Sequence, residues 1–131
     1  MLKGSCLCGA VKYEIHGDLR KVLMCHCRNC RKASGAAFAT NAVVDPSDLK
    51  ITQGEDRIAE YESTPGVLRR FCPNCGSPLY SRRPANPTFI AVRMGTLDTP
   101  VDIRPSGHIF VGSKAEWDVI HDDLPQFEEL P

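Results

Sequence analysis

Seven cysteines in three short motifs are the residues of this chain whose types and spacing indicate chemistry. The motifs are Cys6-x-Cys8, Cys25-x-Cys27-x-x-Cys30 and Cys72-x-x-Cys75. An odd number of cysteines leaves one sulfur unpaired in any complete disulfide scheme. Cysteines two residues apart would also close a very small and strained ring. Closely spaced thiolates match the tetrahedral sulfur sites of zinc instead, so the spacing predicts metal binding.

The motif around Cys72 and Cys75, within the segment Phe71-Cys-Pro-Asn-Cys-Gly-Ser77, has the form of a zinc knuckle. A knuckle turns both sulfurs to one side, donates two ligands and needs two more. Cys6 and Cys8 can supply them, because residues i and i+2 of an extended segment project from the same face. We therefore expect these four cysteines to form a closed zinc site with a structural role.

The remaining cysteines, Cys25, Cys27 and Cys30, lie within six residues. An extended Cys-x-Cys places both sulfurs on one face, and the following turn can fold the third sulfur onto it. Three protein ligands and one vacant position are typical of a catalytic zinc site. An alternative partition gives two of these sulfurs to the knuckle, but it breaks up the triplet without improving the geometry. The sequence thus predicts two zinc ions per chain.

Histidines are the other candidate ligands. His26 could complete the three-cysteine site, but it lies between two ligands on an extended segment and should point to the opposite face. A histidine that hydrogen-bonds behind the site or at the surface is the favoured interpretation. His16, His108 and His121 have no metal-like spacing and are expected to be structural.

Three thiolates and one Zn²⁺ sum to a charge of −1, which a buried site must offset. Arg28, Arg31 and Lys32 lie in the same segment and could hydrogen-bond the sulfurs or meet an acidic substrate. The alternative is a solvated basic turn, and the sequence does not separate the two. Ser34 and Gly35 could shape a pocket wall through their backbone amides.

Short apolar segments between turn residues predict the elements that position these motifs. Alternation over residues 10–16 predicts a half-buried strand, and residues 21–25 predict a second strand that leads into the triplet. Residues 28–34 predict one short helix, which Gly35 ends. Further strands are expected at 37–44, 49–52, 58–61, 67–71, 79–82 and 89–94. Ten prolines and ten glycines punctuate the strands, which is typical of a mainly β, antiparallel fold.

Residues 113–116 form a capping box, so residues 114–120 predict a short helix around Trp117. The alternative is a loop in which the Trp117 side chain fills a gap in the core. The sequence leaves the two open.

Length and charge limit the other possibilities. A chain of 131 residues, 42% hydrophobic and 24% charged, is expected to form a single domain over residues 1–131. Sixteen basic and sixteen acidic residues give no preference for nucleic acid or an anionic membrane. The N-terminus lacks the pattern of a signal peptide, and no apolar stretch approaches the roughly 20 residues of a membrane span. A cytoplasmic protein is therefore expected.

Taken together, the motifs resemble those of the glutathione-dependent formaldehyde-activating enzyme family, which includes centromere-protein-V-like members. The segments that carry the resemblance are Gly4–Val11, Cys25–Gly35, Phe71–Ser77, His108–Val111, Trp117 and Asp122–Phe127. The resemblance implies a β-tent of small antiparallel sheets around a zinc knuckle, with Cys6, Cys8, Cys72 and Cys75 structural and Cys25, Cys27 and Cys30 catalytic. The founding activity of that family is the formation of S-hydroxymethylglutathione from formaldehyde and glutathione, and its members are often described as carbon–sulfur lyases.

These observations predict a zinc enzyme that makes or breaks a carbon–sulfur bond on a small thiol such as glutathione, with the substrate sulfur or oxygen at the vacant position. Zinc lowers the pKa of a bound thiol and polarises a carbonyl. The substrate carboxylates could meet arginines, for which the candidates are Arg69, Arg70, Arg82 and Arg83. The rival hypothesis is a non-enzymatic two-zinc binding module, in which Cys27-x-x-Cys30 senses redox state by forming a disulfide.

Overall fold

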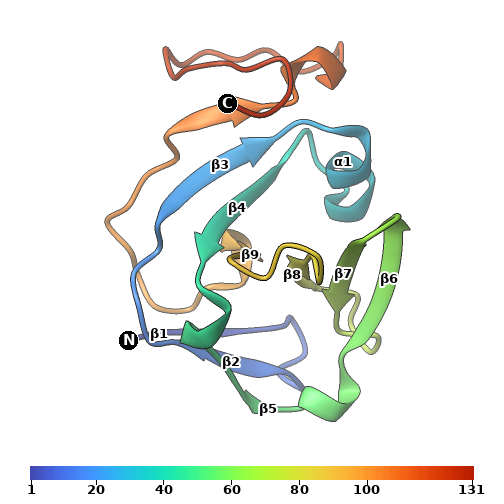
Figure 1. Cartoon of the computed structure of the whole chain (residues 1–131), viewed down its shortest axis with the longest axis vertical. Helices are drawn as coiled ribbons and strands as arrows, with labels where there is room; N and C mark the ends of the chain where they lie inside the picture. Colours follow the sequence, from blue (N-terminus) through green and yellow to red (C-terminus); the bar gives the residue numbers. More distant parts are fainter.

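Ten short strands in two sheets make up most of the regular structure (Figure 1). The computed structural model describes all 131 residues. The smaller sheet has the order β1-β2-β5 and consists of β1 (Leu2–Ser5), β2 (Lys12–Ile15) and β5 (Leu49–Gln53). The larger sheet has the order β10-β3-β4-β9-β8-β7-β6 and consists of β3 (Lys21–Cys25), β4 (Ala39–Val44), β6 (Ala59–Thr64), β7 (Val67–Phe71), β8 (Pro78–Arg82), β9 (Ile90–Arg93) and β10 (Gly107–Ile109).

The main core combines residues of both sheets. Tyr13 and Ile15 of β2 pack in one cluster with Val22, Val44 and Val92 of the larger sheet, and all five are buried. They occupy alternate positions of their strands, because successive side chains of a strand point to opposite faces. Two cysteines, Cys6 and Cys72, belong to the same cluster, so the four-cysteine motifs are anchored in the main core.

The opposite face of the larger sheet is where the three-cysteine motif lies. The strand register pairs Cys25 with Ala39 and Asn41 with Arg93, and these residues alternate with the core residues of β3, β4 and β9. Cys25 and Ala39 form a separate small cluster with Cys30 and Ile109. The face therefore combines a small apolar patch with polar side chains next to the sulfurs.

The one α-helix, α1 (Arg28–Ser34), follows β3 closely and begins directly after Cys27, the middle cysteine of the three-cysteine motif. Cys27 is the N-cap, and its sulfur accepts a hydrogen bond from the backbone N–H of Cys30. Gly35 ends the helix in the left-handed conformation, with φ of 66°, and its N–H donates to the carbonyl of Arg31. Glycine adopts this conformation without strain, which confirms the predicted helix and its stop.

The prediction of a mainly β, antiparallel fold is confirmed. Two of the observed strands were not predicted, and one pair of strands is parallel. β1 and β10 were not expected, because four residues around Gly4 and three residues around His108 lack an alternating apolar pattern. β10 pairs with β3 in parallel, whereas every other ladder is antiparallel. β10 reaches that edge through the long connection over residues 97–106.

Residues 114–120 form a loop, as the alternative expected, but the helix and the role given to Trp117 are wrong. The short 3-10 helix η4 (Val111–Ser113) ends before Lys114, and no helix follows it. Trp117 does not fill the core, because 69% of its surface is exposed. The C-terminal segment instead runs beside β10, where the N–H of His108 donates to Pro125 and the N–H of Phe127 donates to His108 (Figure 1). Residues 113–116 do not act as a capping box, since Ser113 instead ends η4.

None of the helices has the length and apolar character that crossing a membrane requires.

Candidate metal centre and active site

The first cysteine cluster joins two distant parts of the chain. Cys6 and Cys8 lie on the turn after β1, while Cys72 and Cys75 lie between β7 and β8. All four sulfurs lie within 4.8 Å of one another. The expected extended Cys-x-Cys is wrong, because Gly9 N–H donates to the Cys6 carbonyl and closes a turn. This turn, rather than an extended strand, brings the two N-terminal sulfurs together.

Ser77 links the two halves of this four-cysteine cluster. Its hydroxyl accepts a hydrogen bond from the backbone N–H of Leu7 at 2.9 Å and contacts the sulfur of Cys75 at 3.4 Å. Hydrogen bonds from the Ser77 side chain and backbone lower the pKa of Cys75 to about 5. The contacts of Ser77 thus favour the thiolate form of Cys75, which is the form in which a cysteine binds a metal.

The spacing of the sulfurs is that of a tetrahedral metal site. The sulfur of Cys8 lies 3.6 Å from that of Cys6 and 3.8 Å from that of Cys72. Four sulfurs at about 2.3 Å from a central ion stand about 3.8 Å apart. No two of the seven cysteines form a disulfide. The four sulfurs could therefore hold a metal ion.

The second cluster is local in sequence and more enclosed. Cys25 ends β3, Cys27 caps α1 and Cys30 lies in its first turn. Their three sulfurs also lie within 4.8 Å of one another, so this group could hold a metal ion as well. Cys25 and Cys30 are each 5% exposed, and Cys27 is half-buried. The expected extended Cys-x-Cys followed by a turn describes this segment well.

The cations beside this three-cysteine cluster come from the larger sheet. Both terminal nitrogens of Arg69, on β7, lie 3.7 Å from the sulfur of Cys30, and its Nε donates to Ser63 at 2.9 Å. Arg93, on β9, is only 7% exposed and has no carboxylate partner. Its guanidinium donates to the side-chain oxygen of Asn41 at 2.8 Å and to the carbonyl of Ala91.

These contacts divide the charge unevenly among the three sulfurs. Hydrogen bonds from Cys25 and Cys27, together with the charges of Arg69 and Arg93, lower the pKa of Cys30 to about 2. The same hydrogen bonds and burial raise the pKa of Cys25. Burial lowers the pKa of Arg93, while the charge of Cys30 opposes that shift. The two arginines therefore act as counter-ions of a thiolate cluster.

The basic residues of α1 do not have the role that the sequence suggested. Arg28 and Lys32 are exposed, and neither they nor Arg31 makes a hydrogen bond to a sulfur. Arg28 and Lys32 therefore fit the solvated alternative, whereas Arg31 is half-buried and its Nε has no hydrogen-bond partner. Ser34 donates its hydroxyl to the carbonyl of Cys30 at 2.7 Å, and the N–H of Gly35 is used within the helix. Neither residue offers a free amide to a pocket wall.

Two of the four arginines proposed for substrate carboxylates are already paired. Glu60 accepts from Arg82 at 2.8 Å and lies 3.4 Å from Arg70, which also donates to Tyr80. Alternation along β7 turns Arg70 to the face opposite Arg69. Arg83 stacks over the Phe89 ring at 5.7 Å.

The histidine between the ligands is buried and turned away from the sulfurs. His26 is 0% exposed, and its Nε2 lies 2.8 Å from Nδ1 of His108. It is not part of either group of metal-ligand atoms. His16, which contacts Glu14, and His121 lie at the surface. The three-cysteine cluster consequently has no fourth protein ligand in reach.

Arg93 and the pairing of His26 with His108 were missed from the sequence. An arginine at the end of the apolar run 89–94 was the available signal for Arg93, because a charged residue at an inward position needs a partner. The histidine pair has no local signal, since 82 residues separate its members.

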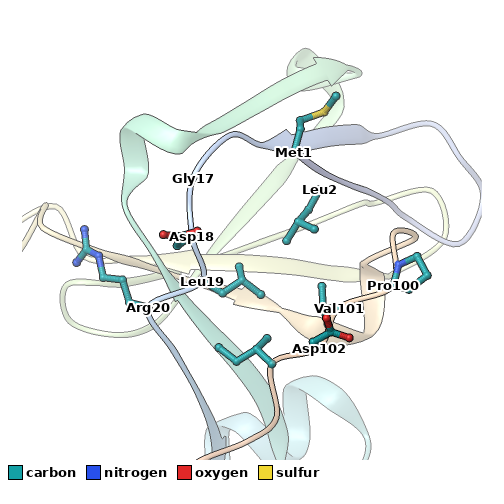
Figure 2. A pocket seen from close by; sticks show the side chains of 10 residues that line it. Met1, Leu2, Gly17, Asp18, Leu19, Arg20, Pro100, Val101 and Asp102 are labelled. Carbon is teal, nitrogen blue, oxygen red and sulfur yellow. The ribbon is translucent and has the colours of Figure 1, made fainter.

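One surface pocket, of about 770 Å³, lies away from both clusters. Figure 2 shows its lining, which comes from the first two residues, the segment 17–20 and the segment 100–103. It contains no cysteine or histidine, and its Arg20 also lies 3.2 Å from Asp45. The pocket therefore shares no residue with either cysteine cluster.

Comparisons with known proteins agree with this geometry. The family profile "Glutathione-dependent formaldehyde-activating enzyme" matches residues 1–113. A "Putative glutathione-dependent formaldehyde-activating enzyme" of Halomonas elongata is 29% identical over 126 residues, which cover 89% of this chain and 79% of that protein. An "Uncharacterized lyase" of Schizosaccharomyces pombe is 33% identical over 67% of this chain and 64% of its own length.

Two further comparisons concern length and fold. The chain spans only 42% of a relative from Colletotrichum graminicola that carries the same name as the Halomonas protein, at 26% identity over 62% of this chain. A crystal structure of a Rhodobacter sphaeroides protein, 27% identical, matches with a TM-score of 0.64 over 76% of this chain and 91% of that one. On the match of residues 1–113, the chain belongs to the glutathione-dependent formaldehyde-activating enzyme family.

Proposed function

We propose that this protein is a zinc-dependent carbon–sulfur lyase that acts on a small thiol or its aldehyde adduct. The observation that carries the proposal is the three-cysteine cluster with no fourth protein ligand, because His26 is engaged by His108. Three protein ligands and one free position are typical of catalytic zinc sites. Family membership and the printed names of the relatives support the reaction class.

The two clusters have different roles in this proposal. Cys25, Cys27 and Cys30 hold the catalytic zinc, while Cys6, Cys8, Cys72 and Cys75 hold a structural zinc that ties the N-terminal turn to the β7–β8 connection. Four sulfurs leave no position for a substrate. The whole chain acts as one domain, and seven free thiols fit a reducing compartment such as the cytoplasm.

The reaction joins a thiol and an aldehyde or separates their adduct. In the forward direction the substrate sulfur forms a bond to the carbonyl carbon, the π electron pair moves to oxygen, and the thiol proton ends on that oxygen. A zinc ion held by the three sulfurs would supply a Lewis acid that lowers the pKa of a thiol and polarises a carbonyl.

The residues around the cluster assist this chemistry by charge and position. Arg69 and Arg93 offset the negative charge of three thiolates, so that an anionic substrate is not repelled. The sulfur of Cys27 accepts the N–H of Cys30 at the start of α1, which fixes its position beside the other two sulfurs. Among the four arginines considered for a glutathione-type substrate, Arg69 contacts Cys30 and the other two besides Arg83 pair with Glu60, which leaves Arg83 as the candidate.

The test is X-ray absorption of the zinc- or cobalt-loaded protein with and without glutathione, together with aldehyde turnover. We expect two metal ions per chain, additional sulfur around the three-cysteine metal when thiol is added, and thiol-dependent loss of formaldehyde. Cys27→Ser should remove the second metal and the turnover. Cys8→Ser is not a useful control, because it disturbs the structural cluster.

The rival is a non-enzymatic two-zinc module in which Cys27 and Cys30 sense redox state. It predicts an unchanged coordination shell across a range of thiols and no turnover of any aldehyde. That pair of results would contradict the proposed activity and leave the binding module standing.

A further inference from the structure

A buried histidine pair lies directly behind the three-cysteine cluster. His26, between Cys25 and Cys27, is 0% exposed, and His108, on β10, is 2% exposed. Nε2 of His26 lies 2.8 Å from Nδ1 of His108. The two rings are tilted with centroids 5.0 Å apart, and the Phe38 ring packs against His26 at the same centroid distance. A histidine buried this completely needs a defined partner for its polar atoms.

The hydrogen-bond partners fix the direction of the chain. Nε2 of His108 lies 3.1 Å from both carboxylate oxygens of Asp122, which can only accept, so this nitrogen carries a proton. In neutral His108 the other nitrogen, Nδ1, then accepts, and Nε2–H of His26 donates to it. The hydrogen bonds therefore run from His26 through His108 to Asp122. The remaining nitrogen of His26 faces Asp118 at 4.0 Å, beyond hydrogen-bond distance.

The backbone ties the same residues together. The N–H of His26 donates to the carbonyl of Ile109 at 2.9 Å, continuing the parallel ladder in which Ile109 pairs with Cys25. On its other side, His108 exchanges two backbone hydrogen bonds with residues 125–127. Asp122 also accepts from the N–H of Leu124 at 3.0 Å, which fixes its carboxylate. His26 is thus held by its main chain and its ring at once.

We propose that His108 and Asp122 are positioning residues of the three-cysteine site, because they hold His26 and thereby aim the two sulfurs that flank it. The proposal rests on the proposed function, in which these sulfurs bind a metal. When the ring of His26 is fixed, the backbone dihedrals of the peptides on either side are restricted, and with them the directions of Cys25 and Cys27. The segment 114–131, which supplies Asp122, lies beyond the family match over 1–113 and becomes part of the site.

The test compares metal affinity at the two clusters of the full-length chain. Protein loaded with Co²⁺ at both clusters is titrated with a competing chelator under anaerobic conditions, and the spectrum of Co²⁺-loaded Cys27→Ser identifies the four-cysteine site. We expect His108→Leu to weaken Co²⁺ binding at the three-cysteine site by about 10- to 100-fold, the range for lost partners behind a ligand. The four-cysteine site should keep its affinity and its spectrum.

Asp122 provides variants whose folding is not in question, because its side chain is 45% exposed. Asp122→Ala should weaken the three-cysteine site by less than His108→Leu does. Asp122→Asn should restore most of the affinity, since its amide oxygen still accepts from His108. Asp123→Ala, next to it and exposed, is the matched control and should change nothing. If His108→Leu does not fold, the comparison of Asp122→Ala with Asp122→Asn tests the proposal by itself.

A second readout does not depend on metal. The ¹⁵N–¹⁵N coupling across the hydrogen bond between His26 and His108 should be measurable in wild type and in Asp122→Asn, and lost in Asp122→Ala. Unchanged Co²⁺ affinity in a folded His108→Leu or in Asp122→Ala would overturn the positioning role and leave the proposed function intact. Equal weakening of both clusters would overturn it as a general loss of stability. Wild type that takes one Co²⁺, at the four-cysteine site, would overturn both proposals, even if the coupling is present.

Discussion

The two cysteine clusters show two solutions to the same electrostatic problem. The four-cysteine cluster has no arginine or lysine among its hydrogen-bond partners, and its polar contacts are Ser77, the N–H of Val11 and solvent at the exposed Cys8. The three-cysteine cluster is more enclosed and has Arg69 against Cys30, with Arg93 nearby. Where water is excluded, fixed cations replace it as the source of charge stabilisation.

The clusters also differ in what holds them together. Cys6 and Cys72 are 66 residues apart and lie in the main core, so the four sulfurs close a long-range connection. Cys25, Cys27 and Cys30 are local, and α1 with its N-cap already arranges them. Loss of a ligand should therefore affect folding at the first cluster and function at the second.

The largest expected effect tests that difference directly. Cys72→Ser, or Cys75→Ser, removes a ligand from a site whose metal-binding free energy, of order 10 kcal/mol, is also folding free energy. Since a domain of this kind is stable by only about 5–15 kcal/mol, we expect loss of cooperative thermal unfolding or insoluble protein. Cys27→Ser should unfold cooperatively, near the wild-type midpoint. Equal loss of the transition in both variants would make both clusters structural.

The second prediction concerns the order in which the metals leave. The four-cysteine site should hold zinc more tightly, because it has one more thiolate ligand than the three-cysteine site. Stepwise chelation followed by metal analysis should give two zinc ions per chain at first and then one. X-ray absorption of the half-depleted protein should show four sulfur neighbours. A residual zinc on Cys25, Cys27 and Cys30 would show instead that solvent access at Cys8 decides the order.

The third prediction isolates the counter-ion. Arg69→Met should weaken metal binding at the three-cysteine site by about 10- to 100-fold, because it removes a donor to the ligand Cys30. The metal affinity of Arg69→Lys should lie between those of wild type and Arg69→Met, since lysine keeps the charge but lacks the paired N–H donors of arginine. Arg28→Met, exposed on α1, is the matched control. Co²⁺ titration measures the affinity of all three variants. If Arg28→Met lost as much affinity as Arg69→Met, the counter-ion would belong to α1 and the assignment to Arg69 would be wrong.

The local part of this site could be predicted from the sequence. Residues 28–34 and the stop at Gly35 follow from short-range rules of capping and backbone conformation. The strands at 21–25 and 67–71 follow from the local apolar pattern and match the observed bounds. The grouping of Cys25, Cys27 and Cys30 likewise follows from their close spacing in the sequence.

The non-local part could not be predicted in the same way. The contact of Arg69 with Cys30 depends on how the larger sheet curves past α1, and the pairing of His26 with His108 depends on the parallel edge strand β10. No periodic pattern in the sequence indicates either of these two contacts. The helix expected at 114–120 does not form, because the 3-10 helix η4 ends at Ser113, the residue that was expected to cap it.

The smallest expected effect tests whether arginines on the two faces of the larger sheet act independently. Glu60 holds Arg82 and Arg70 on the face opposite Arg69, and all three side chains are partly exposed. Glu60→Gln should therefore lower the free energy of unfolding by no more than about 1 kcal/mol at neutral pH, as for other exposed ion pairs. It should leave both metal affinities unchanged, because neither arginine contacts a sulfur.

The pH dependence gives this last prediction its sign. The hydrogen bond from Arg82 holds the pKa of Glu60 below its ordinary value. The carboxylate thus contributes stability above the pKa of the unfolded chain, about 4.3, and loses it as pH falls through the lower folded value. Urea unfolding of wild type and Glu60→Gln should differ at pH 7 and converge in acid. A difference that persists in acid, or a change in Co²⁺ binding at Cys25, Cys27 and Cys30, would mean that the two faces of the sheet are coupled, and the assignment of Arg69 alone to the cluster would fail.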